Sequence, residues 1–165
     1  MSLARLLIDR GANINAVNKL GQTPLLFSLT GRDHHMAFFF IENGACLEIP
    51  DRSEFYPAHM ASRHGFIDIL RTLIDRHPDQ ADFVSNHGTT PLIEAIVHFR
   101  VECAQLLVEK STINHVDRHG NTAMLYACRM GMTEIINPLF ERGALLEYDH
   151  EEGSKSVMSE AVFYN

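Results

Sequence analysis

An internal period of about 33 residues is the feature that most limits how this chain can fold. A proline that opens an apolar run recurs at a nearly constant spacing, and an alanine takes its place in a fourth copy: Pro24, Pro57, Pro91 and Ala123. Such a period is typical of a stack of small units, none of which can bury its own apolar face alone. A stack of this kind is an extended surface, so the period favours binding over catalysis.

Each period has the pattern of two short helices. The first begins at the proline, where no backbone N–H is needed, after a residue such as Thr23 whose hydroxyl can cap the helix. The second carries apolar residues at positions i, i+1, i+4 and i+5, as between Ile69 and Ile74, which is the stripe of a packed helix face. A glycine such as Gly44 then ends the helix, because glycine adopts the left-handed conformation without strain.

These features resemble the ankyrin repeat, which is opened by a Thr-Pro-Leu-His-x-Ala motif. The resemblance implies an all-α solenoid of stacked antiparallel helix pairs joined by projecting β-hairpin loops, with no sheet of any size. Only one unit keeps the motif's histidine, at His59, which in this family ties neighbouring units by hydrogen bonds. We expect a single array over 1–165, with partial repeats at 1–18 and 150–165 and complete repeats at 19–51, 52–85, 86–117 and 118–149.

Both ends of the chain read as incomplete units, which is expected of a piece of a longer array. The closing stretch aligns with the start of a first helix and carries the apolar residues Val157, Met158, Val162 and Phe163. Terminal units of an isolated array need polar outer faces. An uncovered apolar end promotes association, so we expect self-association through this end at high concentration.

Pro138 falls about a turn past Thr133, the expected cap of the second helix in the fourth complete unit. Inside a helix a proline removes a backbone hydrogen bond and crowds the preceding turn, at a cost of ~3 kcal/mol. We expect a kink or a locally weak unit here. The proline is either a hinge or a tolerated flaw, and the flaw is the favoured interpretation.

Composition excludes several classes of function. The net charge is −7 and there is no basic stripe, which excludes nucleic-acid binding. The longest apolar run, Met36 to Ile41, is too short to span a bilayer, and no secretory leader is visible, so no membrane insertion is expected. Cys46, Cys103 and Cys128 lack paired spacing and are typical of reduced thiols in a cytoplasmic, intracellular protein.

Fragments that suggest chemistry do not combine into a site. The ten histidines lack metal-ligand spacing, so neither a metal nor a cofactor is predicted. Cys103 and Cys128 with His98 and His119 suggest a thiol–imidazole pair, but Cys103 lies on an apolar helix face where a buried, inert thiol is the usual state. The sequence therefore predicts a protein that is not an enzyme.

In the family resembled, partners are held by hairpin tips and by outward positions of the first helices. Transferring these positions through the period gives thirteen candidate partner-binding residues: Phe27, Arg52, Phe55, Met60, Arg63, His64, Glu94, His98, Arg118, His119, Tyr126, Arg129 and Met130. Aromatic residues, arginine and methionine, which interface hot spots favour, recur along this line. Basic hairpin tips on an acidic protein also favour a partner of some acidic character.

Three functions follow. The first is a non-catalytic module that binds another protein through its concave groove and hairpin tips. The second is the targeting or regulatory arm of a larger enzyme or channel, such as a kinase, ubiquitin ligase or palmitoyltransferase. The third is a substrate role, because Asn15 with Leu7 eight residues upstream resembles the asparagine hydroxylation site of some ankyrin repeats, and Asn114 with Leu106 has the same spacing.

Overall fold

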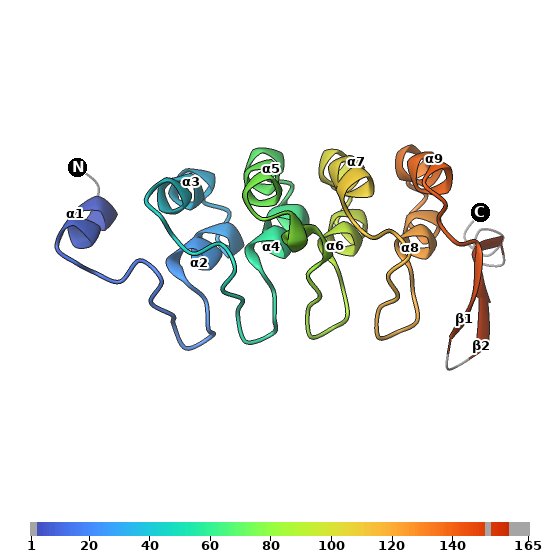
Figure 1. Ribbon diagram of the computed structural model, residues 1–165, viewed down its shortest axis with the longest axis horizontal. Helices are drawn as coiled ribbons and strands as arrows, with labels where there is room; N and C mark the ends of the chain where they lie inside the picture. Colours follow the sequence, from blue (N-terminus) through green and yellow to red (C-terminus); the bar gives the residue numbers. More distant parts are fainter. Residues whose placement is uncertain (1–2, 151–152, 159–165) are drawn as a thin grey trace.

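In the computed structural model, the helices form two rows along one long axis and follow one another in chain order from one end of the array to the other (Figure 1). The structure describes residues 3–150 and 153–158. After α1 (Leu3–Asp9) come four helix pairs: α2 (Pro24–Thr30) and α3 (His34–Glu42), α4 (Pro57–His64) and α5 (Ile67–Arg76), α6 (Pro91–Val97) and α7 (Val101–Lys110), α8 (Ala123–Arg129) and α9 (Thr133–Glu141). We call α2, α4, α6 and α8 the inner row, and α3, α5, α7 and α9 the outer row.

The inner helices begin as the sequence predicted in three of the four pairs. The hydroxyl oxygen of Thr23 accepts the N–H of Leu26 at 3.2 Å, and Thr90 and Thr122 cap α6 and α8 in the same way. In the remaining pair, Tyr56 precedes α4 at the position that threonine holds in the other three. The ring of His59 accepts the Tyr56 N–H at 3.3 Å, but no described side chain caps the first N–H groups of α4 itself.

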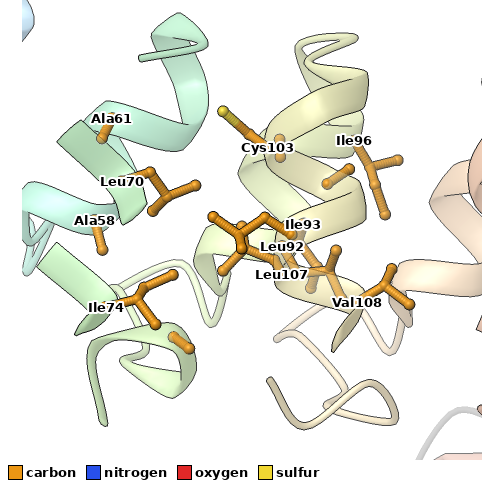
Figure 2. Close-up of a cluster of buried hydrophobic side chains, with 14 of the residues drawn as sticks. Ala58, Ala61, Leu70, Ile74, Leu92, Ile93, Ile96, Cys103, Leu107 and Val108 are labelled. Carbon is orange, nitrogen blue, oxygen red and sulfur yellow. The ribbon is translucent and has the colours of Figure 1, made fainter. Parts of the chain in front are cut away.

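The core is a continuous seam between successive units. Figure 2 shows its middle, where apolar side chains of α4 and α5 face those of α6 and α7. Leu70, Ile93 and Leu107 are at most 1% exposed there, and burial of a side chain of this size contributes roughly 1.5–3 kcal/mol. The small side chains of Ala58 and Ala61 are fully buried and let neighbouring helices approach closely.

Positive φ angles mark the ends of the helices. Gly44 and Gly143 follow outer helices with φ of 81° and 82°, which confirms the predicted left-handed glycine at this place. Within two of the pairs a left-handed glycine also separates the helices, whereas in the other two the left-handed residue is Arg32, next to Gly31, or Phe99, with φ of 59° and 56°. These two residues are strained, because a side chain disfavours this conformation.

The last hairpin corrects one expectation. Strand β1 (Glu147–His150) pairs antiparallel with β2 (Gly153–Ser156), so the expected absence of any sheet was wrong. Each earlier hairpin closes tightly around one side-chain oxygen, as between Asn18 and Gln22, which leaves no length for a ladder. Helices still contribute most of the apolar seam, and the all-α solenoid class is confirmed.

Two expectations about the fourth complete unit need correction. Helix α9 begins after Met132 without a side-chain cap, so Thr133 is its first residue and not its cap. The helix is continuous through Pro138, and whether this unit is weak stays a prediction.

Val157 is buried, so it does not contribute to an uncovered apolar end, whereas Met158 is exposed. Val162 and Phe163 lie outside the described residues, and self-association through this end also stays a prediction.

The candidate protein-binding groove

One side-chain oxygen holds the base of each of four hairpins. The Oδ1 atom of Asn18 accepts the backbone N–H groups two and four residues later, at 2.9 and 3.0 Å. Asp51, Ser85 and Asp117 stand at the same place in the next three units, and each accepts two N–H groups in the same way. The repeated turn makes the hairpins project on the same side of the array (Figure 1).

Neighbouring hairpins also bond to one another. The backbone N–H of Arg52 donates to the Leu20 carbonyl at 3.1 Å, and that of Asn86 donates to Ser53 at 3.0 Å. A Cβ atom at Gly88 would lie 2.6 Å from the backbone nitrogen of Arg118, so this position requires glycine. The hairpins therefore form one continuous wall beside the inner row.

A cavity of about 400 Å³ lies between this wall and the inner row, from the second to the fourth complete unit. We call it the groove pocket. Eleven residues line it: Phe55, Arg63, His87, Thr89, Ile93, Glu94, Val97, His98, Asp117, His119 and Tyr126. Six of the thirteen residues predicted from the sequence thus lie together: Phe55, Arg63, Glu94, His98, His119 and Tyr126.

An ion pair fixes one wall of the groove pocket. The Nε of Arg63 donates to Oε2 of Glu94 at 3.0 Å, across the boundary between α4 and α6. The hydroxyl of Thr89 donates to the other carboxylate oxygen at 2.9 Å. The Arg63 guanidinium also lies over the ring of Phe55, 4.6 Å from its centre. Glu94 is 5% exposed, and a carboxylate buried this deeply needs such partners to offset its desolvation.

A second polar cluster fixes the opposite wall. The Tyr126 hydroxyl donates to Oδ2 of Asp117 at 2.6 Å, and the amide of Asn121 donates to the Tyr126 oxygen at 3.3 Å. Burial, and after it the bond to Asp117, raise the pKa of Tyr126 to about 12. The hydroxyl therefore stays protonated at physiological pH. It remains a hydrogen-bond donor and holds Asp117 in place.

The sequence did not single out Thr89, Ile93 or Asp117. Two of them could have been found from the sequence, because Asp117 repeats the hairpin-base position of Asp51 and Thr89 lies beside the capping Thr90. Ile93 carried no such signal, because an isoleucine in an inner helix reads as core. His87 and Val97 were not among the thirteen predicted residues.

For one set of equivalent positions, the repeat pattern predicted more exposure than the structure shows. Phe27, Met60, Glu94 and Tyr126 are equivalent, and we expected all four to face the groove. Met60 is 4% exposed and lies in the core, so it cannot contact a partner. The physical reason is the chemistry of the side chains: apolar Met60 packs in the core, whereas the carboxylate of Glu94, which is 5% exposed, bonds to Arg63 and lines the groove pocket. Phe27 belongs to the first complete unit and is 64% exposed.

The remaining predicted residues surround the groove pocket or lie apart from it. Arg52 and Arg118 are exposed at hairpin tips, whereas His64, Arg129 and Met130 are half-buried at the ends of inner helices. Burial and neighbouring arginines lower the pKa of His64 to about 4. The thirteen residues therefore do not form one surface, and the groove pocket is the part that the fold brings together.

Asn15 and Asn114, the candidate hydroxylation sites, connect successive units. The Oδ1 of Asn15 accepts the N–H of Cys46 at 2.8 Å, and that of Asn114 accepts the N–H of Leu145 at 2.9 Å. Asp82 makes the equivalent bond to Thr112 at 2.6 Å. These side chains have a structural role, and their hydroxylation stays a prediction that intact mass after incubation with such a hydroxylase would test.

The described residues show little of the chemistry that enzymes or membrane proteins use. No group of three or more histidine, cysteine or acidic residues lies there in a position to hold a metal ion. None of the helices in this part of the chain has the length and apolarity needed to cross a membrane. Burial raises the pKa of Cys103 to about 12, so its thiol is not a nucleophile near neutral pH.

Comparison with known proteins gives a consistent result. A family model described as ankyrin repeats (3 copies) matches residues 1–83 and 59–150. The chain is 30% identical over 112 residues to the ankyrin repeat protein nuc-2 of Neurospora crassa, covering 67% of this chain and 10% of that protein. It is 29% identical over 98 residues to the probable 26S proteasome regulatory subunit p28 of Saccharomyces cerevisiae, covering 59% and 43%.

A putative ankyrin repeat protein of Fowlpox virus, FPV022, is 26% identical over 147 residues, covering 88% of this chain and 23% of the viral protein. The chain thus spans less than half the length of each of these three relatives. The two matched ranges together extend from residue 1 to 150 and include all of the described helices. The chain belongs to the ankyrin-repeat family.

Proposed function

We propose that this array is a non-catalytic module that binds a partner protein through its concave groove and hairpin tips. The observation that supports the proposal is the groove pocket, which joins side chains of three successive units in one cavity. Its walls combine aromatic rings, an arginine and apolar Ile93 and Val97. Cavities with these side chains are where binding energy concentrates in protein interfaces.

The walls are also held in place before any partner binds. Glu94 and Asp117 are buried and hydrogen-bonded, and each fixes a neighbour, Arg63 or Tyr126. A rigid pocket loses little conformational entropy on binding, so more of the contact energy appears as affinity. This supports a binding role in which the groove pocket receives a side chain of the partner.

Filling the groove pocket tests the proposal. In a Val97→Trp variant the indole would occupy the cavity while leaving the ion pair and the Tyr126 bond in place. We expect it to weaken binding of peptides selected by display against the intact chain by at least about tenfold. Gln105→Trp, on the exposed side of α7, is the matched control and should bind normally. Thermal unfolding verifies that both variants fold. Equal binding by all three chains, or failure to select any peptide, would contradict the proposal.

A second candidate is that the array is the targeting or regulatory arm of a larger enzyme or channel. The match to this chain covers about a tenth of nuc-2, so in that relative the matched array is a small part of a much longer protein, which supports this candidate. The kinase, ubiquitin ligase and palmitoyltransferase classes remain open. We also propose an intracellular location, supported by the three free cysteines among the described residues.

A further inference from the structure

We infer that the segment bound in the groove is acidic, and that one of its carboxylates is received by Arg63 at the groove pocket. This inference rests on the proposed function and adds the chemistry of the partner. Two independent observations carry it: the distribution of charge between the two sides of the array, and the geometry of Arg63.

Charge is divided unequally between the two sides. The hairpins, inner helices and following turns occupy 16–33, 49–66, 83–100 and 115–132. These segments contain seven of the 14 lysine and arginine residues but only five of the 21 acidic residues. Their net charge is therefore +2, whereas the other residues up to Leu146 carry −5. The last hairpin lies outside these segments, and residues 147–165, which include it, carry −4. Along the four helix pairs, the groove side is therefore the positive side of an acidic protein.

Two of the five acidic groups in these segments are not available to a partner. Glu94 and Asp117 are 5% and 3% exposed, and their oxygens bond to neighbours within the array. The cationic Lys19, Arg52 and Arg118 are exposed at the tips of the first, second and fourth hairpins. A partner approaching the hairpins therefore meets more positive charge than the sequence count alone indicates. Complementary charge both steers association and selects the partner.

Arg63 is prepared to bind a carboxylate. Its Nε donates to Glu94, and its two terminal amino groups have no hydrogen-bond acceptor among the described residues. The side chain is 30% exposed, and the ring of Phe55 beneath it keeps the guanidinium in one orientation. A guanidinium fixed in this way can form two parallel hydrogen bonds to one carboxylate.

Histidine rings complete the surroundings of this position. His87, His98 and His119 line the same cavity, and the Nδ1 of His98 lies 3.7 Å from the Glu94 carboxylate. A basic side chain entering here would approach Arg63, and both carboxylates of the pocket already have partners. A nucleic acid would need a continuous track of cations, whereas the third hairpin, between those of Arg52 and Arg118, contains no lysine or arginine. An acidic protein segment fits these groups best.

The test begins with selection of short random peptides against the immobilised intact chain. We expect the retained peptides to share an aspartate or glutamate beside an apolar or aromatic residue. Retained peptides that share a lysine or arginine, or no charged residue, would overturn the inference while leaving the proposed function standing. Displacement of the acidic peptides by a single-stranded oligonucleotide at equal charge concentration would also overturn it.

A double variant then tests the role of Arg63. Arg63→Gln alone would leave Glu94 buried without its ionic partner, so Arg63→Gln/Glu94→Gln removes both charges together. We expect this variant to bind the acidic peptide about tenfold more weakly. A peptide with its carboxylate replaced by an amide should bind the parent and the double variant alike. Arg71→Gln, an exposed position on α5, is the control. Unchanged binding by the double variant, or an equal loss in the control, would overturn the inference.

Discussion

His59 connects two units through both of its ring nitrogens. Nδ1 accepts the N–H of Tyr56 at the start of α4, and Nε2 lies 3.0 Å from the carbonyl oxygen of Thr89 in the next hairpin. This confirms the tie between units that the repeat motif implied for this histidine. The side chain is fully buried, and the burial lowers its pKa from 6.5 to about 4.

This lowered pKa makes stability depend on pH. The unfolded chain binds a proton at His59 near pH 6.5, whereas the folded chain does not bind it until about pH 4. The stabilisation is therefore fully present above pH 6.5 and is lost as the pH falls toward 4, by roughly 3 kcal/mol in all. We expect denaturant unfolding to show this loss. A His59→Gln variant should be less stable at pH 7 but flatter between pH 6.5 and 4, with His64 keeping part of the slope. An unchanged slope would contradict the assignment to His59.

At the scale of the element, the turns between paired helices contain strain. Phe99 has a φ of 56° and is exposed, so its side chain contributes little packing to offset the left-handed conformation. Ordinary residues lose roughly 1–2 kcal/mol in this conformation, and glycine does not. Phe99→Gly should be more stable than Phe99→Ala by about 1 kcal/mol, since both remove the ring and only glycine relieves the strain. Urea unfolding of the two variants gives the difference, and a more stable alanine variant would rule out the strain.

The inserted turn after α5 contains a buried polar group. In η1 (Pro78–Asp82), Gln80 is fully buried and neither its amide nitrogen nor its oxygen has a hydrogen-bond partner in the described residues. An unsatisfied amide lowers stability by roughly 1–3 kcal/mol. Gln80→Met keeps a similar shape and should raise the free energy of unfolding by about 1 kcal/mol. The exposed Asp79→Ala change should alter it little. A destabilised Gln80→Met protein would show that the amide has a partner in solution.

Elements were predictable from sequence where one local rule determines them. The period located the helix pairs, and threonine caps and glycine ends were visible in single residues such as Thr23 and Gly44. The groove pocket was only half predictable, because equivalent positions of the repeat carry side chains of different chemistry. Met60 and Glu94 occupy equivalent positions in the repeat, yet one lies in the core and the other lines the pocket. The repeat period does not predict contacts between units, such as the ion pair of Arg63 with Glu94.

At the scale of the whole molecule, the stability of the array is distributed along its length. Each unit contacts only its neighbours, so units can open separately. Helix α1 has no buried residue, whereas α4 to α7 contain the fully buried side chains of the central seam. We expect native-state hydrogen exchange to be fastest in α1 and slowest in α4 to α7. Uniform exchange along the array would contradict this order.

The last complete unit provides the sharper test of this picture. Within α9 the ring nitrogen of Pro138 cannot donate to the carbonyl of Glu134, four residues earlier, so one helical bond is absent. Pro138→Ala can restore that bond. Because coupling reaches only adjacent units, we expect the variant to slow amide exchange in α8 and α9 and leave α4 and α5 unchanged. Equal slowing in all helices would show that the array unfolds as one unit. If the parent chain already showed its greatest protection in α9, the proline would not be a weak point at all.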